Sequence, residues 1–471
     1  MDTKKLRQKI LDLAIHGKLV PQDPNDEPAS VLLERIKVEK EQLIKEGKIK
    51  RSRKSAKTSD TPHYEQVKLE VPNSWYMVSV SDLFLLNPKS ELDDNMKVGF
   101  IPMALVEDGF SGDHFYEERT WKDVKRGYCH FQNGDIGIAK ISPCFENRKS
   151  TIFKNLPNTY GAGTTELVIL RPIKVYTKFY LYLFKSDWYV KEGTKYFKGV
   201  VGQQRVHKEI FTDLHIPLPP FAEQQRIVEE IEYWFVLIDQ IEQDKSDLQT
   251  AIRQTKSKIL DLAIHGKLVL QNPNDEPASE LLKRINPKAE ITCDNGHYPV
   301  GWIDVILGDI FYHNTGKALN SSNKEGVLRN YLTTSNVYWN QFDLSLVKQM
   351  PFRDNELEKC TVQKGDLLVC EGGDVGRSAI WNFDYNICIQ NHIHRLRPKG
   401  DLNVSFYYYV LRFLKEHNRI GGKGIGLLGL SSNELHKIGM PLPPRKEQDR
   451  IVLKIEELFS VLDNIENALE A

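Results

Sequence analysis

Two nearly identical stretches of twenty residues constrain this chain more than any other feature. Residues 11–30 read LDLAIHGKLVPQDPNDEPAS, and residues 260–279 read LDLAIHGKLVLQNPNDEPAS, with eighteen identical positions at an offset of 249. A second pair, PLPPFAEQQRIVEEIE from position 217 and PLPPRKEQDRIVLKIE from position 441, repeats at an offset of 224. Because buried cores tolerate substitutions that keep volume and patterning, repeats this strict need an explanation beyond core packing.

The order of the repeats indicates a closed, two-fold arrangement. The two motifs are joined directly in the central segment, whereas the other copy of this joined unit is split between the ends of the chain. At the two offsets, residue 471 aligns with position 247 and residue 1 aligns with position 250. A weaker pair, residues 71–84 and 298–311, opens the two regions between the repeats, and each region continues to a Gly-Asp turn. The chain therefore predicts a pseudosymmetric, circularly closed object with two variable regions.

The central segment predicts one long helix, because apolar residues recur in steps of three and four over five heptads. Paired prolines precede each copy and exclude helix there, while Gly17 and Gly266 stand where a glycine ends a helix. On the heptads alone, a plain dimerisation coiled coil is an alternative. The apolar seam of this scaffold consists of Ile227, Ile231, Trp234, Ile238, Ile241, Leu248, Ile252, Ile259, Leu262, Ile451, Ile455, Leu458, Leu462 and Ile465.

Composition excludes several classes of protein. Sixty-four basic residues balance sixty-four acidic ones, which argues against a strong stand-alone polyanion binder but allows local patches. The six cysteines form no CxxC pair, as expected of free thiols in a reducing compartment. Without a long apolar run or a signal-like N-terminus, we expect a cytoplasmic chain that does not span a membrane. A basic stretch between residues 45 and 57 is best interpreted as a solvated linker.

Motifs for catalysis are lacking. Gly424, Gly426 and Gly429 match GxGxxG, but neither the preceding helix-like segment nor the following proline suits a dinucleotide site. There is no P-loop and no amino-methyltransferase tetrapeptide, and the nuclease-like ExK tripeptide at residues 46–48 falls in the charged linker. His392 and His394 would share a strand face, yet no third metal ligand stands at a sensible spacing, so polar-contact histidines are favoured. The sequence predicts neither catalytic residues nor a metal site.

An uneven charge distribution indicates where nucleic acid could bind. Residues 140–208 carry thirteen basic and four acidic residues, a net charge of +9. Phosphates require cations, and base edges require amides, guanidinium groups and hydroxyls. Polar loops are common in α/β domains, so each residue by itself is weak evidence. The candidate DNA-binding residues are Lys140, Asn147, Arg148, Lys149, Thr164, Thr165, Lys198, Gln203, Gln204, Arg205, Arg377, Gln390, Asn391, His392, Lys423, Ser431 and Asn433.

The doubled AIHGKLV and PNDEPAS blocks, the doubled PLPP blocks and the paired openings of the variable regions resemble the specificity subunit of type I restriction-modification enzymes. The resemblance covers essentially the whole chain. It implies an α/β (α+β) fold with two globular target-recognition domains joined by long antiparallel coiled-coil helices. We expect the recognition domains at 62–220 and 291–444, with an N-terminal helix and basic linker at 1–61, a central long helix and connector at 221–290, and a C-terminal helix at 445–471.

The resemblance also implies a function without catalysis in this chain. Each recognition domain would read one half of a bipartite, asymmetric DNA site, while the helices set the spacing and dock two methyltransferase (modification) subunits. S-adenosylmethionine, ATP and magnesium would be bound by those subunits and by restriction/translocase subunits. A non-catalytic assembly adaptor with variable protein-binding domains is the alternative, and the salt dependence of binding would separate the two because phosphate contacts release counterions.

Overall fold

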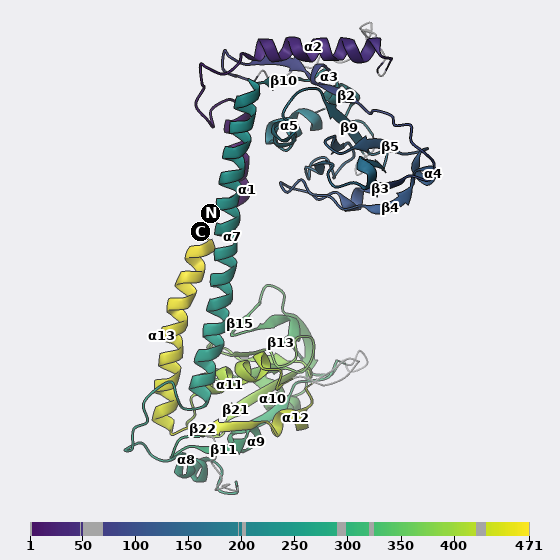
Figure 1. The fold of residues 1–471 in the computed structure, drawn as a ribbon. Coiled ribbons are helices and arrows are strands. Elements are labelled where there is room, and N and C mark those ends of the chain that lie inside the picture. Colours follow the sequence, from purple (N-terminus) through teal and green to yellow (C-terminus); the bar gives the residue numbers. More distant parts are fainter. Residues whose placement is uncertain are drawn as a thin grey trace. The chain divides into compact units, whose positions relative to one another are not determined.

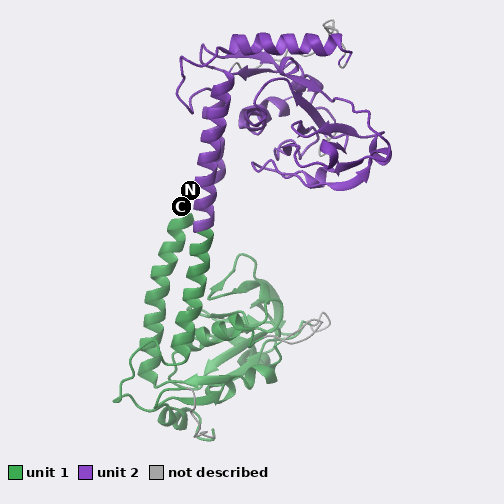
Figure 2. Cartoon of the chain, in the orientation of Figure 1, with its two compact units in different colours: residues 1, 245–471 green, residues 2–244 purple. Residues whose placement is uncertain are grey.

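The computed structural model describes residues 2–47, 49, 69–195, 197–199, 204–289, 298–319, 325–420 and 430–470. The chain divides into two compact units (Figure 2). We call residues 2–244 the N-terminal unit, which is purple in Figure 2, and residues 245–471 the C-terminal unit, which is green. Each unit combines helices with small antiparallel or mixed sheets, as the α+β expectation requires.

The N-terminal unit carries its sheets beside a helical pair (Figure 1). Its two-stranded sheet pairs β1 (Tyr76–Ser79) with β10 (His215–Leu218). One four-stranded sheet has the order β2 (Phe84–Leu86), β9 (Leu167–Pro172), β6 (Ile136–Ala139), β7 (Ser150–Ile152). The other has the order β4 (Glu117–Thr120), β3 (Lys97–Ile101), β8 (Tyr160–Gly163), β5 (Cys129–Gln132). The helices are α1 (Thr3–Ile15), α2 (Ala29–Lys45), α3 (Val80–Leu83), α4 (Trp121–Val124), α5 (Thr177–Phe184), α6 (Asp187–Thr194) and the start of α7 (Phe221–Ile264).

The C-terminal unit repeats this topology. Its two-stranded sheet pairs β11 (Ile303–Ile306) with β22 (Gly439–Leu442). The four-stranded sheets have the orders β12 (Phe311–Thr315), β21 (Ile393–Pro398), β18 (Leu367–Cys370), β19 (Ser378–Ile380), and β16 (Lys348–Phe352), β13 (Val327–Leu332), β20 (Ile387–Ile389), β17 (Thr361–Val362). A small hairpin, β14 (Val337–Tyr338) with β15 (Gln341–Phe342), is added. The helices are the end of α7, α8 (Ala278–Ile285), α9 (Leu307–Ile310), α10 (Asp354–Cys360), α11 (Val404–Glu416), α12 (Ser432–His436) and α13 (Arg445–Glu470).

Short 3-10 turns complete the units at Met103–Leu105, Pro157–Thr159, Lys208–Phe211 and Thr334–Asn336. Among the residues that the structure describes, no helix is long and apolar enough to cross a membrane.

The repeated sequence blocks hold each sheet domain on its helices by the same buried contacts. In the N-terminal unit, the Glu223 carboxylate accepts hydrogen bonds from the Trp75 indole (2.9 Å) and the Gln22 amide (2.5 Å). In the C-terminal unit, Glu447 accepts from Gln271 and is hydrogen-bonded to Trp302. Burial raises the pKa of both carboxyl groups. A buried polar group needs such partners, which explains why these positions are kept identical in the two copies.

In both units the repeated helix ends at a glycine, as the sequence predicted. Gly17 follows α1 and Gly266 follows α7, with φ of 64° and 65°. A Cβ at Gly17 would stand 2.5 Å from the Pro72 ring, and one at Gly266 would stand 2.4 Å from the Pro299 ring. Positive φ and this close approach both require glycine, so the predicted helix ends are confirmed.

The apolar seam predicted along the helices requires correction. Ile227, Ile231 and Ile238 are buried in the N-terminal core, but Trp234 is 41% exposed and its neighbour Phe235 is 9% exposed. Since the helix turns 100° per residue rather than strictly following a 3.5-residue period, the buried face moves by one position there. The other predicted seam residues divide into buried or half-buried positions (Ile252, Ile259, Leu262, Ile451, Ile455, Leu458, Leu462) and exposed ones (Ile241, Leu248, Ile465).

Candidate nucleic-acid interface

Six residues predicted to bind DNA lie together in the N-terminal unit. They occupy the loops after β6 and β8 and the strand-like pair formed by residues 198 and 205. The Lys140 amide donates to the Glu166 carbonyl (2.9 Å), and the Val206 amide donates to the Lys140 carbonyl (2.8 Å). We call this set the N-terminal loop cluster, which comprises Lys140, Thr164, Thr165, Glu166, Lys198, Gln204 and Arg205.

One acid organises the cations of the N-terminal loop cluster. The Arg205 guanidinium donates to both Glu166 oxygens, at 2.9 Å from Nε to Oε2 and 2.8 Å from Nη2 to Oε1. These bonds and the nearby Lys140 charge lower the pKa of Glu166. Lys198, whose backbone pairs with that of Arg205, brings the cluster to three cations and one carboxylate, and Thr165, Lys198 and Arg205 are exposed. The cluster thus presents a net positive, hydrogen-bonding surface, which suits a phosphate or a base edge.

The C-terminal unit has a loop cluster on the same backbone frame. The Glu371 amide donates to the His392 carbonyl (2.9 Å), and the Leu430 amide donates to the Glu371 carbonyl (2.9 Å). The Gln390 amide donates to the Leu332 carbonyl (3.0 Å), as the Thr164 amide does to Ile101 (3.3 Å). We call this the C-terminal loop cluster, which comprises Glu371, Gln390, Asn391, His392, Leu430 and Ser431.

The two loop clusters share backbone hydrogen bonds but carry different side chains at the equivalent positions. The hydrogen-bond frame places Gln390, Asn391 and His392 at the positions of Thr164, Thr165 and Glu166. It also places an acid, Glu371, where the N-terminal unit has Lys140. His392 Nδ1 lies 3.3 Å from a Glu371 oxygen, so the acid stands at the Lys140 position here and the basic residue at the Glu166 position. Two domains that share this backbone arrangement but differ in their polar side chains can recognise different base sequences.

Three predicted cations serve the protein interior instead. The Lys149 ammonium donates to the Val106 carbonyl (2.7 Å), and Arg377 donates to the Thr334 carbonyl (2.5 Å) and lies over the Tyr338 ring. Arg148 pairs with Asp187 and donates to the Lys185 carbonyl (3.0 Å). Sequence reasoning counted their charges but had no means of seeing these buried carbonyls. These contacts give the three cations a structural role, and their contact with DNA stays a prediction.

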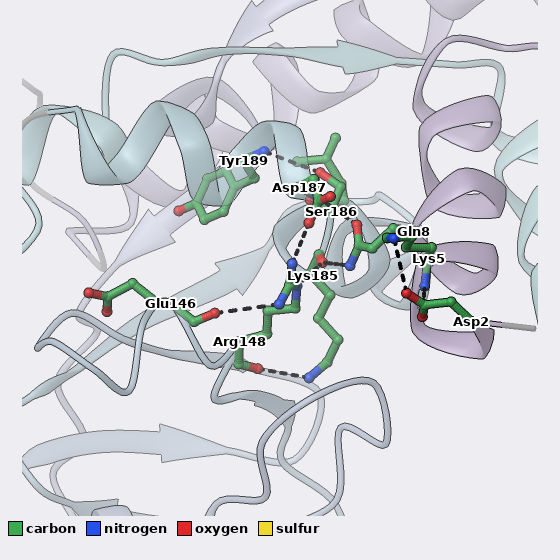
Figure 3. Close-up of polar contacts among 10 residues, drawn as sticks. Asp2, Lys5, Gln8, Glu146, Arg148, Lys185, Ser186, Asp187 and Tyr189 are labelled. Atoms are coloured by element: carbon green, nitrogen blue, oxygen red, sulfur yellow. Dashed lines mark hydrogen bonds and ion pairs between the residues drawn. The ribbon is translucent and has the colours of Figure 1, made fainter. Parts of the chain in front are cut away.

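Figure 3 shows Arg148 within a junction between the sheet domain and α1. The Gln8 amide donates to the Lys185 carbonyl (3.1 Å), and the Asp187 amide donates to the Gln8 side chain (2.8 Å). The Lys185 ammonium is buried and donates to the Gly109 and Arg148 carbonyls, and burial lowers its pKa to about 7. A cavity of about 610 Å³ opens beside these residues and is lined by Asp2, Lys4, Lys5, Lys9, Trp188 and Lys191, among others.

The remaining predicted residues have individual positions. Asn147 is exposed, and its carbonyl accepts from Gly109 (2.9 Å). Ser431 caps α12 through Glu434, on which helix Asn433 is exposed. Gln203, Lys423 and the glycine motif at 424–429 lie outside the described residues, as does most of the basic linker.

The histidine prediction is partly corrected. Only His394 lies in β21, whereas His392 precedes it. His394 is buried, with Nδ1 3.0 Å from His313 Nε2 and Nε2 2.8 Å from the Leu430 carbonyl. Burial and the neighbouring imidazole lower the pKa of His313 to about 4. Within the described parts of the chain no metal-binding group of three ligands occurs, and His394 has the polar-contact role that the sequence favoured.

Glu166 and Glu371 are the site residues that sequence reasoning missed. Both were passed over because acids were counted against phosphate binding. The available signal was position, since each follows or joins a loop that already held predicted residues. Acids at such positions orient neighbouring guanidinium or imidazole groups and can accept a hydrogen bond from cytosine.

Two copies of one fold, each with a differing polar loop cluster on a common frame, define a duplicated recognition protein. The family model "Type I restriction modification DNA specificity domain" matches residues 72–249 and again residues 299–471. The chain therefore belongs to this family, as the sequence resemblance predicted, and has the two recognition domains of a type I restriction-modification specificity subunit.

Relatives and solved structures agree with this assignment. The chain is 33% identical to the type I restriction enzyme EcoAI specificity subunit of Escherichia coli, over 98% of this chain and 90% of the relative. It is also 33% identical to the EcoEI specificity subunit of Escherichia coli, over 99% and 91%. The HsdS subunit from Thermoanaerobacter tengcongensis shares the fold, with a TM-score of 0.55 at 18% identity over 84% of this chain and 92% of that one. A chain from work on assembly of the type I R-M system gives a TM-score of 0.60 at 18% identity, covering 85% and 93%.

Proposed function

We propose that each unit reads one half of a bipartite, asymmetric DNA site through its loop cluster. The observation that carries this proposal is the pair of equivalent backbone frames with different polar side chains. Arg, Gln, Asn, Thr and Glu side chains are those that recognise base edges in the major groove. Because the two clusters differ at every aligned loop position, the two half-sites should differ in sequence.

The helices are proposed to fix the unread gap and to dock the modification subunits. Helix α7 runs from residue 221 to residue 264 and contributes to both units. A continuous helix of 44 residues spans about 66 Å at about 1.5 Å per residue, which supports a fixed number of base pairs between the half-sites. The repeated helix faces would present the same surface twice, so two methyltransferase subunits are the proposed partners, joined by restriction/translocase subunits.

Cofactors are proposed to belong to those partners. S-adenosylmethionine would be bound by the modification subunits, and ATP with magnesium by the translocase subunits. The proposed location is the cytoplasm, where the DNA and these subunits are present.

The test is to co-express the chain with the methyltransferase subunit of its own system and to map methylated adenines across the host genome. A split, asymmetric motif that requires this chain is the expected result. Arg205→Ala should then alter one half of the motif, and Asn391→Ala the other half, because the two residues belong to different units.

Two results would contradict the proposal. A stable complex that adds no methylation would instead favour the assembly adaptor. Binding to DNA that does not weaken with salt would contradict phosphate contacts, since each released counterion steepens the salt dependence.

A further inference from the structure

The edge of the second four-stranded sheet in the C-terminal unit carries an exposed, polar ribbon. Strands β13 and β16 are antiparallel from Val327 opposite Phe352 to Tyr331 opposite Lys348. Neighbouring strand β20 pairs with β13 only at Tyr331 and Leu332. Residues 327–330 and their partners therefore extend beyond the sheet as a two-stranded ribbon, a shape that the major groove of B-DNA admits.

An amide pair lies across this ribbon. Asn330 and Gln349 are directly opposite each other and both exposed, and the Gln349 amide donates to the Asn330 carbonyl oxygen at 2.8 Å. Such a pair always leaves one amide donor and one carbonyl acceptor unused, whichever way the two amides are turned. No other side-chain hydrogen bond to either residue occurs within the described ranges. A free donor beside a free acceptor matches adenine, which offers N7 as an acceptor and N6 as a donor in the major groove.

The surroundings of the pair also suit a DNA groove better than open solvent. Leu328, two residues before Asn330 and therefore on the same face of the strand, is 65% exposed, on a strand edge where aliphatic side chains invite aggregation. Apolar side chains of this kind can contact a thymine methyl group. Arg329 and Lys348 are exposed, and neither has an ion-pair partner among the residues described, so both are available for phosphates.

The opposite face of the ribbon fixes it in place. Tyr331, Met350 and Phe352 are buried in one apolar cluster with Cys360 and Cys388. The Lys317 ammonium, also largely buried, donates to the Pro351 carbonyl (2.8 Å) and to Glu356 (2.6 Å). The ribbon therefore presents its amides from a rigid support, as base reading requires.

The same position in the N-terminal unit lacks these features. There Gly99 stands opposite Glu118, where the C-terminal unit has Asn330 and Gln349. Glu118 pairs with Lys97 at 3.5 Å, and Glu117 pairs with Arg119 at 2.7 Å, so the charges of that ribbon are matched internally. A Cβ at Gly99 would stand 2.8 Å from the Leu156 side chain. The equivalent pair of strands thus carries an amide pair with unused hydrogen-bonding groups in the C-terminal unit. In the N-terminal unit it carries charged side chains that pair with one another.

We propose that the β13–β16 ribbon enters the major groove and reads adenine through the Asn330–Gln349 pair, next to the C-terminal loop cluster. Asn330 lies two residues before Leu332, and the Leu332 carbonyl accepts the hydrogen bond of the Gln390 amide. At about 3.3 Å per residue these positions are about 7 Å apart, the spacing of about two base pairs. The ribbon and the loop cluster would then read one continuous half-site. This inference rests on the proposed function of the chain.

The test uses the complex with its methyltransferase subunits and compares the methylated motif of wild type with those of Asn330→Ala and Gln349→Ala. Each variant is expected to relax one A·T position in a single half-site, with discrimination there falling about 5- to 150-fold, while the other half is unchanged. Glu118→Ala and Lys97→Ala are the matched controls, because they occupy the equivalent ribbon, and they should leave both halves as in wild type.

Further variants separate base reading from phosphate contact. Arg329→Ala and Lys348→Ala should weaken binding equally on all sequences and reduce the salt slope by about one each. Unchanged motifs in Asn330→Ala and Gln349→Ala, in protein that unfolds at the wild-type temperature, would overturn the inference. A uniform loss of affinity in these two variants would overturn it as well. If wild type itself produced no split motif, the proposed function would fail, which is distinguishable from an intact motif that the amide variants do not change.

Discussion

At the residue scale, the repeat includes a charged contact whose chemistry differs between the two units. Arg7 of α1 pairs with Asp239 and Glu242, and Lys256 of α7 pairs with Asp463 and Glu466. The offsets of 249 and 224 make the two sets equivalent. Arg7 also lies over the Phe110 and Phe235 rings, at 6.0 and 5.6 Å. The guanidinium therefore packs against the sheet domain as well as pairing with the acids.

Replacement of Arg7 should loosen α1 selectively. We expect Arg7→Ala to cost about 1–2 kcal/mol, because both carboxylates are exposed and solvent screens them, while the packing over two rings is lost. Arg7→Lys should cost about half as much, since Lys256 fulfils the same pairing. Hydrogen exchange of the α1 amides measures the effect, with α13 as an internal reference and the exposed Lys4→Ala as control. Equal protection in Arg7→Ala and Lys4→Ala would contradict this role.

The buried Lys185 predicts a pH dependence of stability. Its folded-state pKa of about 7 is below the ordinary value of 10.5, because burial disfavours the charged form. Between these pH values the unfolded chain binds the extra proton, so the free energy of unfolding should rise from pH 7 towards pH 10 and fall as the pH drops through 7. Denaturant unfolding at a series of pH values checks this.

Lys185→Met removes the titrating group and serves as the control for that experiment. It should be less stable at high pH, because the Gly109 and Arg148 carbonyls lose their donor, but its stability should change less with pH. A wild-type slope that persists in Lys185→Met would assign the pH dependence to other groups.

Single residues were also where the sequence predicted least. Arg148 and Lys149 were predicted as DNA contacts from their charge alone, and their hydrogen bonds to interior carbonyls, which only the folded chain brings near, were not foreseen. Glu166 was missed because its value lies in what it orients, not in its own charge. Such assignments depend on long-range pairing, which residue type does not encode.

At the element scale, periodicity predicted the helices well and the sheets poorly. The central helix was expected over 221–266 and is found at Phe221–Ile264, because a sustained apolar repeat and a terminal glycine specify it locally. Its buried face was misjudged at Trp234, where Phe235 packs against Phe110 and Tyr182 instead. The strand orders of the sheets were not predicted, since most of their strands are three to six residues long and pair across large sequence separations.

Helix α7 allows a direct test of the proposed spacing role. Deletion of residues 245–251, one heptad, keeps the apolar pattern in phase while shortening the helix by about 10 Å, or about three base pairs. The methylated motif should retain both half-sequences and change only in the length of its gap. If the partner subunits no longer fit the shortened helix, methylation should be lost. Substitution of the same seven residues by alanine is the length-matched control. A shortened helix with the original gap would contradict the spacing role.

At the scale of the whole molecule, the recognition domains should be exchangeable, because both are attached to the helices by equivalent strands and contacts. Residues 76–218 and 303–442 begin and end in equivalent paired strands, β1 with β10 and β11 with β22. Gln224 and Gln448, which are equivalent positions of the repeat, accept a hydrogen bond from the backbone amide of Tyr176 and of Asn403, respectively. A domain cut at these strands therefore keeps its attachment when it is moved.

Replacing residues 76–218 with a second copy of residues 303–442 should give a symmetric site. Both halves of the methylated motif are expected to match the half assigned to the C-terminal unit, in inverted orientation, because the order of the repeats is two-fold. Genome-wide methylation mapping measures this, and reinsertion of the original segment through the same junctions is the control. An asymmetric motif in the exchanged protein would show that the scaffold contributes to base reading.

The division of the chain also determines the order in which it can fold during synthesis. The N-terminal core ends at Ile238, so every residue it needs has been made by position 244. The C-terminal core requires Ile451, Ile455 and Phe459 from the last helix. At about 5–20 residues per second, the remaining 227 residues take roughly 10–50 s. The N-terminal unit can therefore fold while the chain is still on the ribosome, before helix α13, which the C-terminal core requires, has been synthesised.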